Sequence, residues 1–144
     1  MAKQICFEDV EVGQEIPTLK KHPTPEQLVR WAGASGDYNP IHYNAEAAAA
    51  QGLPGIIVHG RLKSAFLCQL VTDWIGERGK LIAISCQHRG MDVPSKDMLC
   101  KGKVTAKYEK DGQRIVECEV WVENDKGQKT APGTAKAALP GKKA

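Results

Sequence analysis

The sequence lacks any apolar run approaching the roughly 20 residues that cross a bilayer. Charged residues interrupt the N-terminal segment, so we expect no signal peptide; they are Lys3, Glu8, Asp9 and Glu11. It also lacks CxxC pairs: the five cysteines are odd in number and widely spaced, at Cys6, Cys68, Cys86, Cys100 and Cys118. This spacing suggests neither a zinc site nor a disulfide framework. A protein of the reducing cytoplasm fits best.

Strong clustering of charge is missing as well. The net charge is +3, and the lysines are scattered except in the segment 136–144, which we expect to be a flexible basic tail. Nucleic-acid binding is therefore not favoured, whereas an anionic small-molecule partner remains compatible with the sequence. With 144 residues, 42% of them hydrophobic, and no repeat or linker, we expect one globular domain over residues 1–144.

Two helices are expected in the N-terminal third. Thr24 is a suitable N-cap for a helix with Pro25 at its first position, and Gly33 to Gly36 should end it. A shorter helix is expected after Asn44 and should stop at Gly52. A turn-rich loop with the sequence GDYNPIH lies between the two.

A longer helix is expected from Gly60 to the glycine at position 76. Apolar residues recur there at every fourth position, namely Leu62, Phe66, Leu70 and Trp74. Additional apolar residues widen this face, which is typical of a helix in the core of a fold. A larger element of the fold must therefore cover the apolar face of this helix.

The second half of the sequence predicts a sheet. Four strands are expected, at 80–89, 98–109, 114–124 and 130–139, separated by hairpin turn signals at 94–97, 111–112 and 124–127. In the third of them, apolar residues alternate with polar ones, and Cys118 should be a buried, inert thiol on the apolar face. An early strand at 15–22 can join the sheet. The pattern predicts an α+β fold in which an antiparallel meander curls around the apolar helix.

Asp37 and His42 are candidate acid–base residues. An Asp before a turn is often only a turn-stabilising residue, and an isolated His is more often structural than catalytic. However, Asn39-Pro40 forces an extended or turn conformation, so the two residues do not lie along one helix. A rigid loop between helices is well suited to hold a carboxylate and an imidazole toward a common point.

Gly60, at the start of the apolar helix, is a candidate oxyanion donor. A helix start has free N–H groups and a partial positive charge, and glycine allows close approach to the backbone. This arrangement could stabilise a carbonyl oxygen that gains negative charge. The alternative is that Gly60 only permits close packing of the helix start.

The runs ASGDYNPIHYN and GLPGIIVHGRL closely resemble the MaoC-like enoyl-CoA hydratase/dehydratase family, which has a hotdog fold. Asp37 and His42 match the family motif Gly-Asp-x-Asn-Pro-x-His, and His59-Gly60 match its later His-Gly pair. The resemblance extends over nearly the whole chain. It implies reversible addition of water to a trans-2-enoyl thioester of coenzyme A or acyl carrier protein, which gives an (R)-3-hydroxyacyl thioester.

The resemblance also implies roles for individual residues. Asp37 would be the base, with His42 as its hydrogen-bond partner or proton donor, and the Gly60 N–H would polarise the thioester carbonyl. Asn39 would brace the loop, and His59 would orient the helix start. No metal or redox cofactor is required, because coenzyme A is part of the substrate.

Two basic residues follow the His-Gly pair. Many family members have an apolar residue where this chain has Arg61, and Lys63 lies two positions further on. Either could contact the phosphates of coenzyme A or a carboxylate on the acyl group, or could be solvated. This departure from the family pattern at Arg61 puts a simple aliphatic acyl group as the substrate in doubt.

Other functions remain open. The chain could be the active subunit of a heteromeric hotdog dehydratase acting on a polar or bulky acyl-CoA, a hotdog thioesterase, or a non-catalytic acyl-CoA-binding protein. Because an isolated hotdog leaves a sheet edge unpaired, we expect a homodimer or a multiple of dimers, or pairing with a related chain. The expected function is an enoyl-CoA hydratase or dehydratase.

Overall fold

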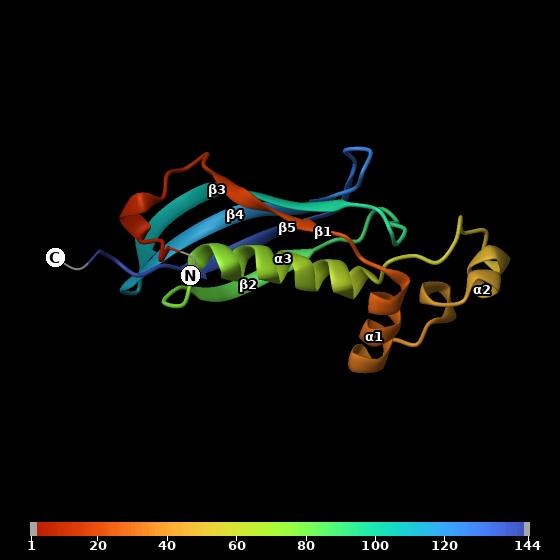
Figure 1. Ribbon diagram of the computed structural model, residues 1–144. Coiled ribbons are helices and arrows are strands. Elements are labelled where there is room, and N and C mark those ends of the chain that lie inside the picture. The colour runs from red at the N-terminus through yellow and green to blue at the C-terminus, as the bar shows by residue number, and fades with distance from the viewer. Residues whose placement is uncertain (1–2, 143–144) are drawn as a thin grey trace.

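The computed structural model describes residues 3–142, with one sheet, one long helix and two short helices (Figure 1). The helices are α1 Pro25–Ser35, α2 Ala45–Ala50 and α3 Gly60–Ile75, with 3-10 turns at Phe7–Asp9 and Pro40–His42. The strands are β1 Glu15–Lys21, β2 Lys80–Cys86, β3 Met98–Lys110, β4 Gln113–Glu123 and β5 Lys129–Ala138. Among the described residues, no helix is both long enough and apolar enough to cross a membrane.

The five strands form one antiparallel sheet in the order β1-β3-β4-β5-β2. The expected meander is correct for β3, β4 and β5 but wrong for β2, which pairs with β5 instead of β3. Residues 94–97 are therefore not a hairpin turn; they lead the chain from one edge of the sheet toward the other. A turn signal reports only local backbone geometry, so it does not identify the strand that follows as a partner.

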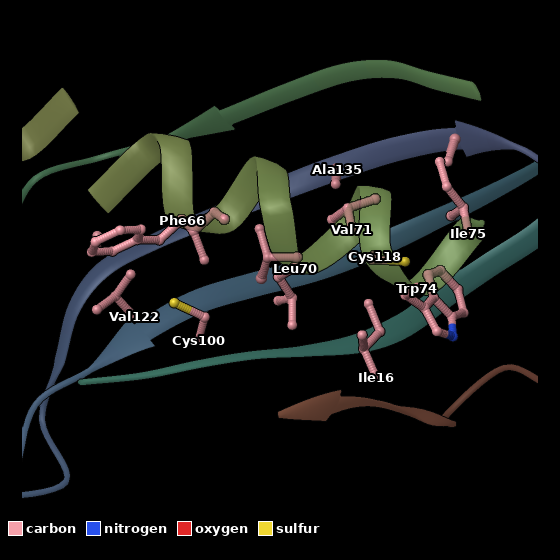
Figure 2. Packing of buried hydrophobic residues seen from close by; sticks show 14 of the residues in the cluster. Ile16, Phe66, Leu70, Val71, Trp74, Ile75, Cys100, Cys118, Val122 and Ala135 are labelled. Carbon is pink, nitrogen blue, oxygen red and sulfur yellow. The ribbon is translucent and has the colours of Figure 1, made fainter. Parts of the chain in front are cut away.

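The curved sheet wraps around α3, which runs along its concave face (Figure 1). Residues of α3 including Phe66, Leu70 and Trp74 face Cys118 and other side chains of the strands (Figure 2). The four predicted core positions of α3 are all at most 6% exposed. Burying one such large apolar side chain contributes about 1.5–3 kcal/mol, so this contact is the main hydrophobic core. Burial also raises the pKa of the Cys118 thiol to about 12, as expected for an inert core cysteine.

The C-terminal segment differs from the expected flexible tail. Residues up to Ala138 belong to β5, and Leu139 is only 5% exposed. Pro140 accepts a hydrogen bond of 2.9 Å from the N–H of Phe7, and the Lys142 ammonium pairs with Asp9. The prediction is therefore wrong for residues 136–142, because backbone pairing and one apolar side chain hold this segment; residues 143–144 lie outside the described part.

The short helices begin and end where local sequence signals predict. The Thr24 hydroxyl accepts a hydrogen bond from the N–H of Gln27, and Asn44 caps α2 in the same way. α1 continues through Gly33 and ends at Gly36, whose φ of 75° is left-handed. Figure 1 shows α1 and α2 beyond one end of the sheet, with α1 nearer than α2 to the first turn of α3. The loop between them is thereby held close to the start of the central helix.

Candidate active site

The loop between α1 and α2 is braced by its own polar side chains. Asp37 Oδ1 accepts a hydrogen bond of 3.3 Å from the N–H of Asn39, and Asn39 Oδ1 accepts one of 3.3 Å from the N–H of Ile41. The second bond caps the 3-10 turn that contains His42. Asn39 thus makes the kind of side-chain contact that the sequence suggested.

Asp37 and His42 are directed toward each other without touching. The His42 Nδ1–H donates to the Ile57 carbonyl at 2.7 Å, so in the neutral ring Nε2 carries the lone pair. This Nε2 lies 3.9 Å from Asp37 Oδ2, which is too long for a direct hydrogen bond. A water oxygen about 2.8 Å from each atom would fit between them. The Asp37 side chain is 37% exposed and that of His42 only 9%, so solvent reaches the pair from the carboxylate side.

His59 lies against His42 and fastens the loop to the start of α3. The two rings are stacked, with centroids 3.7 Å apart and 20° between their planes. His59 is fully buried, and its Nε2–H donates to the Asp37 carbonyl at 3.3 Å. Burial, and secondly the neighbouring His42, lower the pKa of His59, so it is neutral near pH 7. This contact orients the loop relative to the helix, consistent with the expected supporting position.

Asp37, His42 and His59 also form a group that could bind a metal ion. Each offers one ligand atom, and the three atoms lie within 4.8 Å of one another. Two imidazole nitrogens and a carboxylate oxygen suit a divalent transition metal such as zinc. The acid–base chemistry derived below uses these residues without a metal.

Gly60 combines an amide that is unpaired within the described part of the chain with close packing of its Cα. Its N–H donates no hydrogen bond to any group of residues 3–142 and lies at the positive end of α3. The space that a Cβ would occupy is filled by His88: it would lie 2.6 Å from Nδ1, 2.8 Å from Cγ and 2.9 Å from Cε1. A larger residue at position 60 would therefore displace the imidazole. Close packing and a free amide coexist at this glycine.

Three of the candidate residues line an open cleft of about 740 Å³, and His42, beside Asp37, is not among its lining residues. Its walls come from α1, the loop, the first turns of α3 and the segment after β2: Trp31, Ser35, Asp37, Gly60, Arg61, Ser64 and His88. Arg61 is exposed on this wall, which leaves its guanidinium free to meet a charged group. Of the residues predicted from the sequence, Asp37, Gly60 and Arg61 thus line the same cleft.

Lys63 neither contacts the cleft nor is solvated, the two positions that the sequence suggested for it. Its ammonium donates to Asp92 Oδ2 and to the Gly90 carbonyl, each at 2.8 Å, and both charged side chains are 2% exposed. The Asp92 carbonyl accepts a hydrogen bond of 2.7 Å from the N–H of Val58. The pair thus ties the first turn of α3 and the residues before it to the segment after β2. The sequence could not show this, because Asp92 lies 29 residues away.

Sequence reasoning missed Ser64 and His88. Ser64 lies one turn after Gly60 on the same side of α3, so helical spacing would have indicated it. No local signal marks His88, which was expected at the end of a strand. It reaches the cleft only because β2 pairs with β5.

Comparisons with known proteins place the chain in a family. The MaoC like domain family matches residues 8–128. Fatty acid synthase subunit beta of Gibberella zeae is 38% identical over 71 residues, which are 49% of this chain but 3% of that protein. The 3-oxo-4,17-pregnadiene-20-carboxyl-CoA hydratase beta subunit of Mycobacterium tuberculosis is 34% identical over 65 residues, which are 45% of this chain and 50% of that subunit. The chain therefore matches only part of the length of these curated relatives.

Solved structures share the architecture. R-hydratase PhaJ1 from Pseudomonas aeruginosa has a TM-score of 0.86 at 24% identity, over 96% of this chain and 88% of that one. A chain of the ChsH1-ChsH2 complex from Mycobacterium tuberculosis has a TM-score of 0.79 at 26% identity, over 90% and 98%. The first likeness establishes the fold alone. Since the family match extends over most of the sequence and includes the loop and the start of α3, the chain belongs to the MaoC-like dehydratase family and has its hotdog fold.

Proposed function

We propose that the protein catalyses reversible hydration of trans-2-enoyl thioesters, of coenzyme A or acyl carrier protein, to (R)-3-hydroxyacyl thioesters. The observation that carries the proposal is the 3.9 Å separation of His42 Nε2 and Asp37 Oδ2, where Asp37 lines the same cleft as Gly60. Two acceptors at this separation can hold one water molecule between them. Membership of a dehydratase family supports the reaction class.

The residues divide the reaction between them. Asp37 removes a proton from the bound water as its oxygen attacks C3 of the enoyl group, His42 Nε2 accepts a hydrogen bond from that water and so holds it, and the proton taken up by Asp37 is returned to C2. The Gly60 N–H donates to the thioester oxygen, where negative charge develops as the C2–C3 double bond opens. Asn39 and His59 keep the loop in position. Each proton lost by water is gained by the product, so the reaction needs no external oxidant or reductant.

A hydration assay with crotonyl-CoA tests this function. Loss of enoyl absorbance indicates hydration, release of free thiol indicates a thioesterase, and neither change points to an acyl-CoA-binding protein or a missing partner. General acid–base groups contribute about 10²–10⁴-fold each, so Asp37→Asn and His42→Gln should each lower kcat by that order. The double variant should be little worse than the poorer single one, because the two act as a unit. Turnover by Asp37→Asn near the wild-type rate would refute the assignment.

Which part of the acyl-CoA Arg61 contacts is a separate part of the proposal. Arg61 is exposed in the cleft and can pair with a phosphate of coenzyme A or with a carboxylate on the acyl chain. Arg61→Met should raise KM for every acyl-CoA in the first case, and only for carboxylated or strongly polar ones in the second. A panel of short, long, branched and dicarboxylic enoyl-CoAs separates the two. Equal KM values for both proteins throughout the panel would exclude a ligand contact.

A heteromeric assembly on a polar or bulky acyl-CoA is the second candidate. Relatives of this chain include the subunit of a pregnadiene-carboxyl-CoA hydratase and a chain of the ChsH1-ChsH2 complex. In addition, β1 and β2 each lie at an edge of the described sheet, and β2 exposes Ile82 (41%). We propose that a second copy or a related chain pairs with such an edge. Light scattering at micromolar concentration tests this, and a fully active monomer would contradict it.

A further inference from the structure

His88 is held firmly although it follows the last residue of β2. The N–H of Gln87 donates to Pro132 and that of Arg89 to Thr130, both at 2.9 Å, which continues the pairing with β5 on either side of His88. On the far side, the Lys63 ammonium donates to the Gly90 carbonyl. The backbone that presents the imidazole is thus anchored to the sheet and to α3.

The ring lies flat on the first residue of α3. Three consecutive ring atoms are nearly equidistant from the Cβ position of Gly60, which places the ring face over the glycine. His88 Nε2 is 3.0 Å from the hydroxyl of Ser64, one turn further along the helix. Nδ1, on the far side of Cε1 from Nε2, is the ring atom nearest to the Cβ position of Gly60 and therefore lies toward the first residue of α3. The N–H groups of the first helical turn point toward the helix N-terminus, and that of Gly60 is the first of them.

The contact of the Ser64 hydroxyl with Nε2 bears on the proton position on the ring. Burial lowers the pKa of His88, as do the charges of Lys63 and Arg61, so the ring is neutral and has a single N–H. When the Ser64 hydroxyl donates to Nε2, that N–H is on Nδ1. The other neighbours of the hydroxyl are the Gly60 carbonyl at 3.4 Å and the Cys86 sulfur at 3.1 Å, both weaker acceptors in this geometry.

We propose that the Nδ1–H of His88 is a second hydrogen-bond donor, beside the N–H of Gly60, for the carbonyl oxygen of a bound acyl thioester. The inference rests on the proposed function in its substrate class, and it adds a residue that contacts the substrate. Two donors would share the negative charge that forms on this oxygen. Ser64 is then a positioning residue, which acts through the tautomer of His88.

Variants that keep one ring nitrogen or the other test the role of Nδ1. The amide nitrogen of Asn lies near the position of Nδ1, and that of Gln near Nε2, so His88→Asn retains the proposed donor and His88→Gln does not. Loss of one oxyanion donor costs about 10²–10³-fold in kcat, so we expect a fall of about 10²-fold for His88→Gln and His88→Leu, with KM little changed. His88→Asn should stay within about tenfold of the wild type, and Ser64→Ala should lie in between. Equal losses in the Asn and Gln variants would show that the ring only packs on Gly60, and would overturn the proposal.

A binding measurement separates this inference from the proposed function. Butyryl-CoA labelled with ¹³C at its carbonyl cannot be hydrated, and the infrared stretch of that carbonyl falls in frequency as hydrogen bonds to it strengthen. The wild type and His88→Asn should give the larger fall, and His88→Gln a smaller one. If crotonyl-CoA is not hydrated while this pattern is seen, the reaction is wrong and the donor is right. Identical shifts in all three proteins, or no binding of butyryl-CoA to the wild type, would overturn the inference.

Discussion

The two ends of α3 differ in their side chains and in what those side chains contact. Toward its C-terminus, Leu70 and Trp74 pack against the sheet and are at most 6% exposed (Figure 2). In its first turns, the helix instead has a free amide at Gly60, a buried ion pair at Lys63 and a hydroxyl at Ser64 that contacts His88. The apolar end fixes the helix in the sheet, and the polar end uses that rigidity to hold groups near the cleft. A site on a rigid element keeps its geometry better than one built only from loops.

Lys63→Met should cause the largest loss of stability at the polar end. Removing one partner of a buried pair leaves an uncompensated charge and costs about 3–5 kcal/mol, in this case at Asp92. Urea unfolding measures the change. Lys63→Met combined with Asp92→Leu should recover much of it, because no buried charge remains.

Lys20 provides the matched control. Its ammonium also lies 2.8 Å from a carboxylate, that of Asp97, but the two side chains are 63% and 46% exposed. Lys20→Met should therefore cost less than about 1 kcal/mol. Similar losses for Lys20→Met and Lys63→Met would mean that burial does not distinguish the polar end.

Leu70→Ala should destabilise the apolar end by about 2–5 kcal/mol through loss of buried surface and the cavity that remains. Its effect on kcat for crotonyl-CoA should be small while the protein is folded, because the side chain faces the strands and not the cleft. Gln69→Ala, an exposed neighbour, is the control and should leave the unfolding free energy almost unchanged. A fall of kcat in the folded Leu70→Ala protein comparable to that of Asp37→Asn would contradict the division between the two ends.

The smallest expected effect is a pH dependence at the polar end. The pKa of His59 is lowered below its ordinary 6.5 in the folded protein, so the unfolded chain binds protons first as the pH falls. The free energy of unfolding is therefore greatest above pH 6.5 and decreases below it, and the lowered pKa of His88 acts in the same direction. His59→Gln keeps a donor for the Asp37 carbonyl and should flatten the slope of the urea midpoint between pH 6.5 and 4.5. Parallel slopes for the two proteins would show that His59 is not responsible.

How far the sequence predicts this molecule depends on the range of each interaction. The bounds of α3 followed from its apolar period and glycines, and the Asp37–His42 loop from a local motif. The partner of β2, the burial of Lys63 and the position of His88 did not follow, because each depends on residues 29 or more positions away along the chain. The predicted strand ends at residue 89, whereas β2 ends at Cys86. The prediction still matches the pairing, because Gln87 and Arg89 donate hydrogen bonds to β5 beyond the last residue of β2.

The pairing of β2 with β5 has a consequence for biosynthesis. A ribosome delivers the loop, α3 and β2 first, and the strand that supports the segment around His88 last, since Thr130 and Pro132 belong to β5. Until β5 emerges, a nascent chain holds the carboxylate and both stacked imidazoles but lacks the support for the opposite wall of the cleft. Contacts between distant parts of the chain form slowly, because closing a long loop is entropically costly. The cleft is therefore completed only after β5 has been translated.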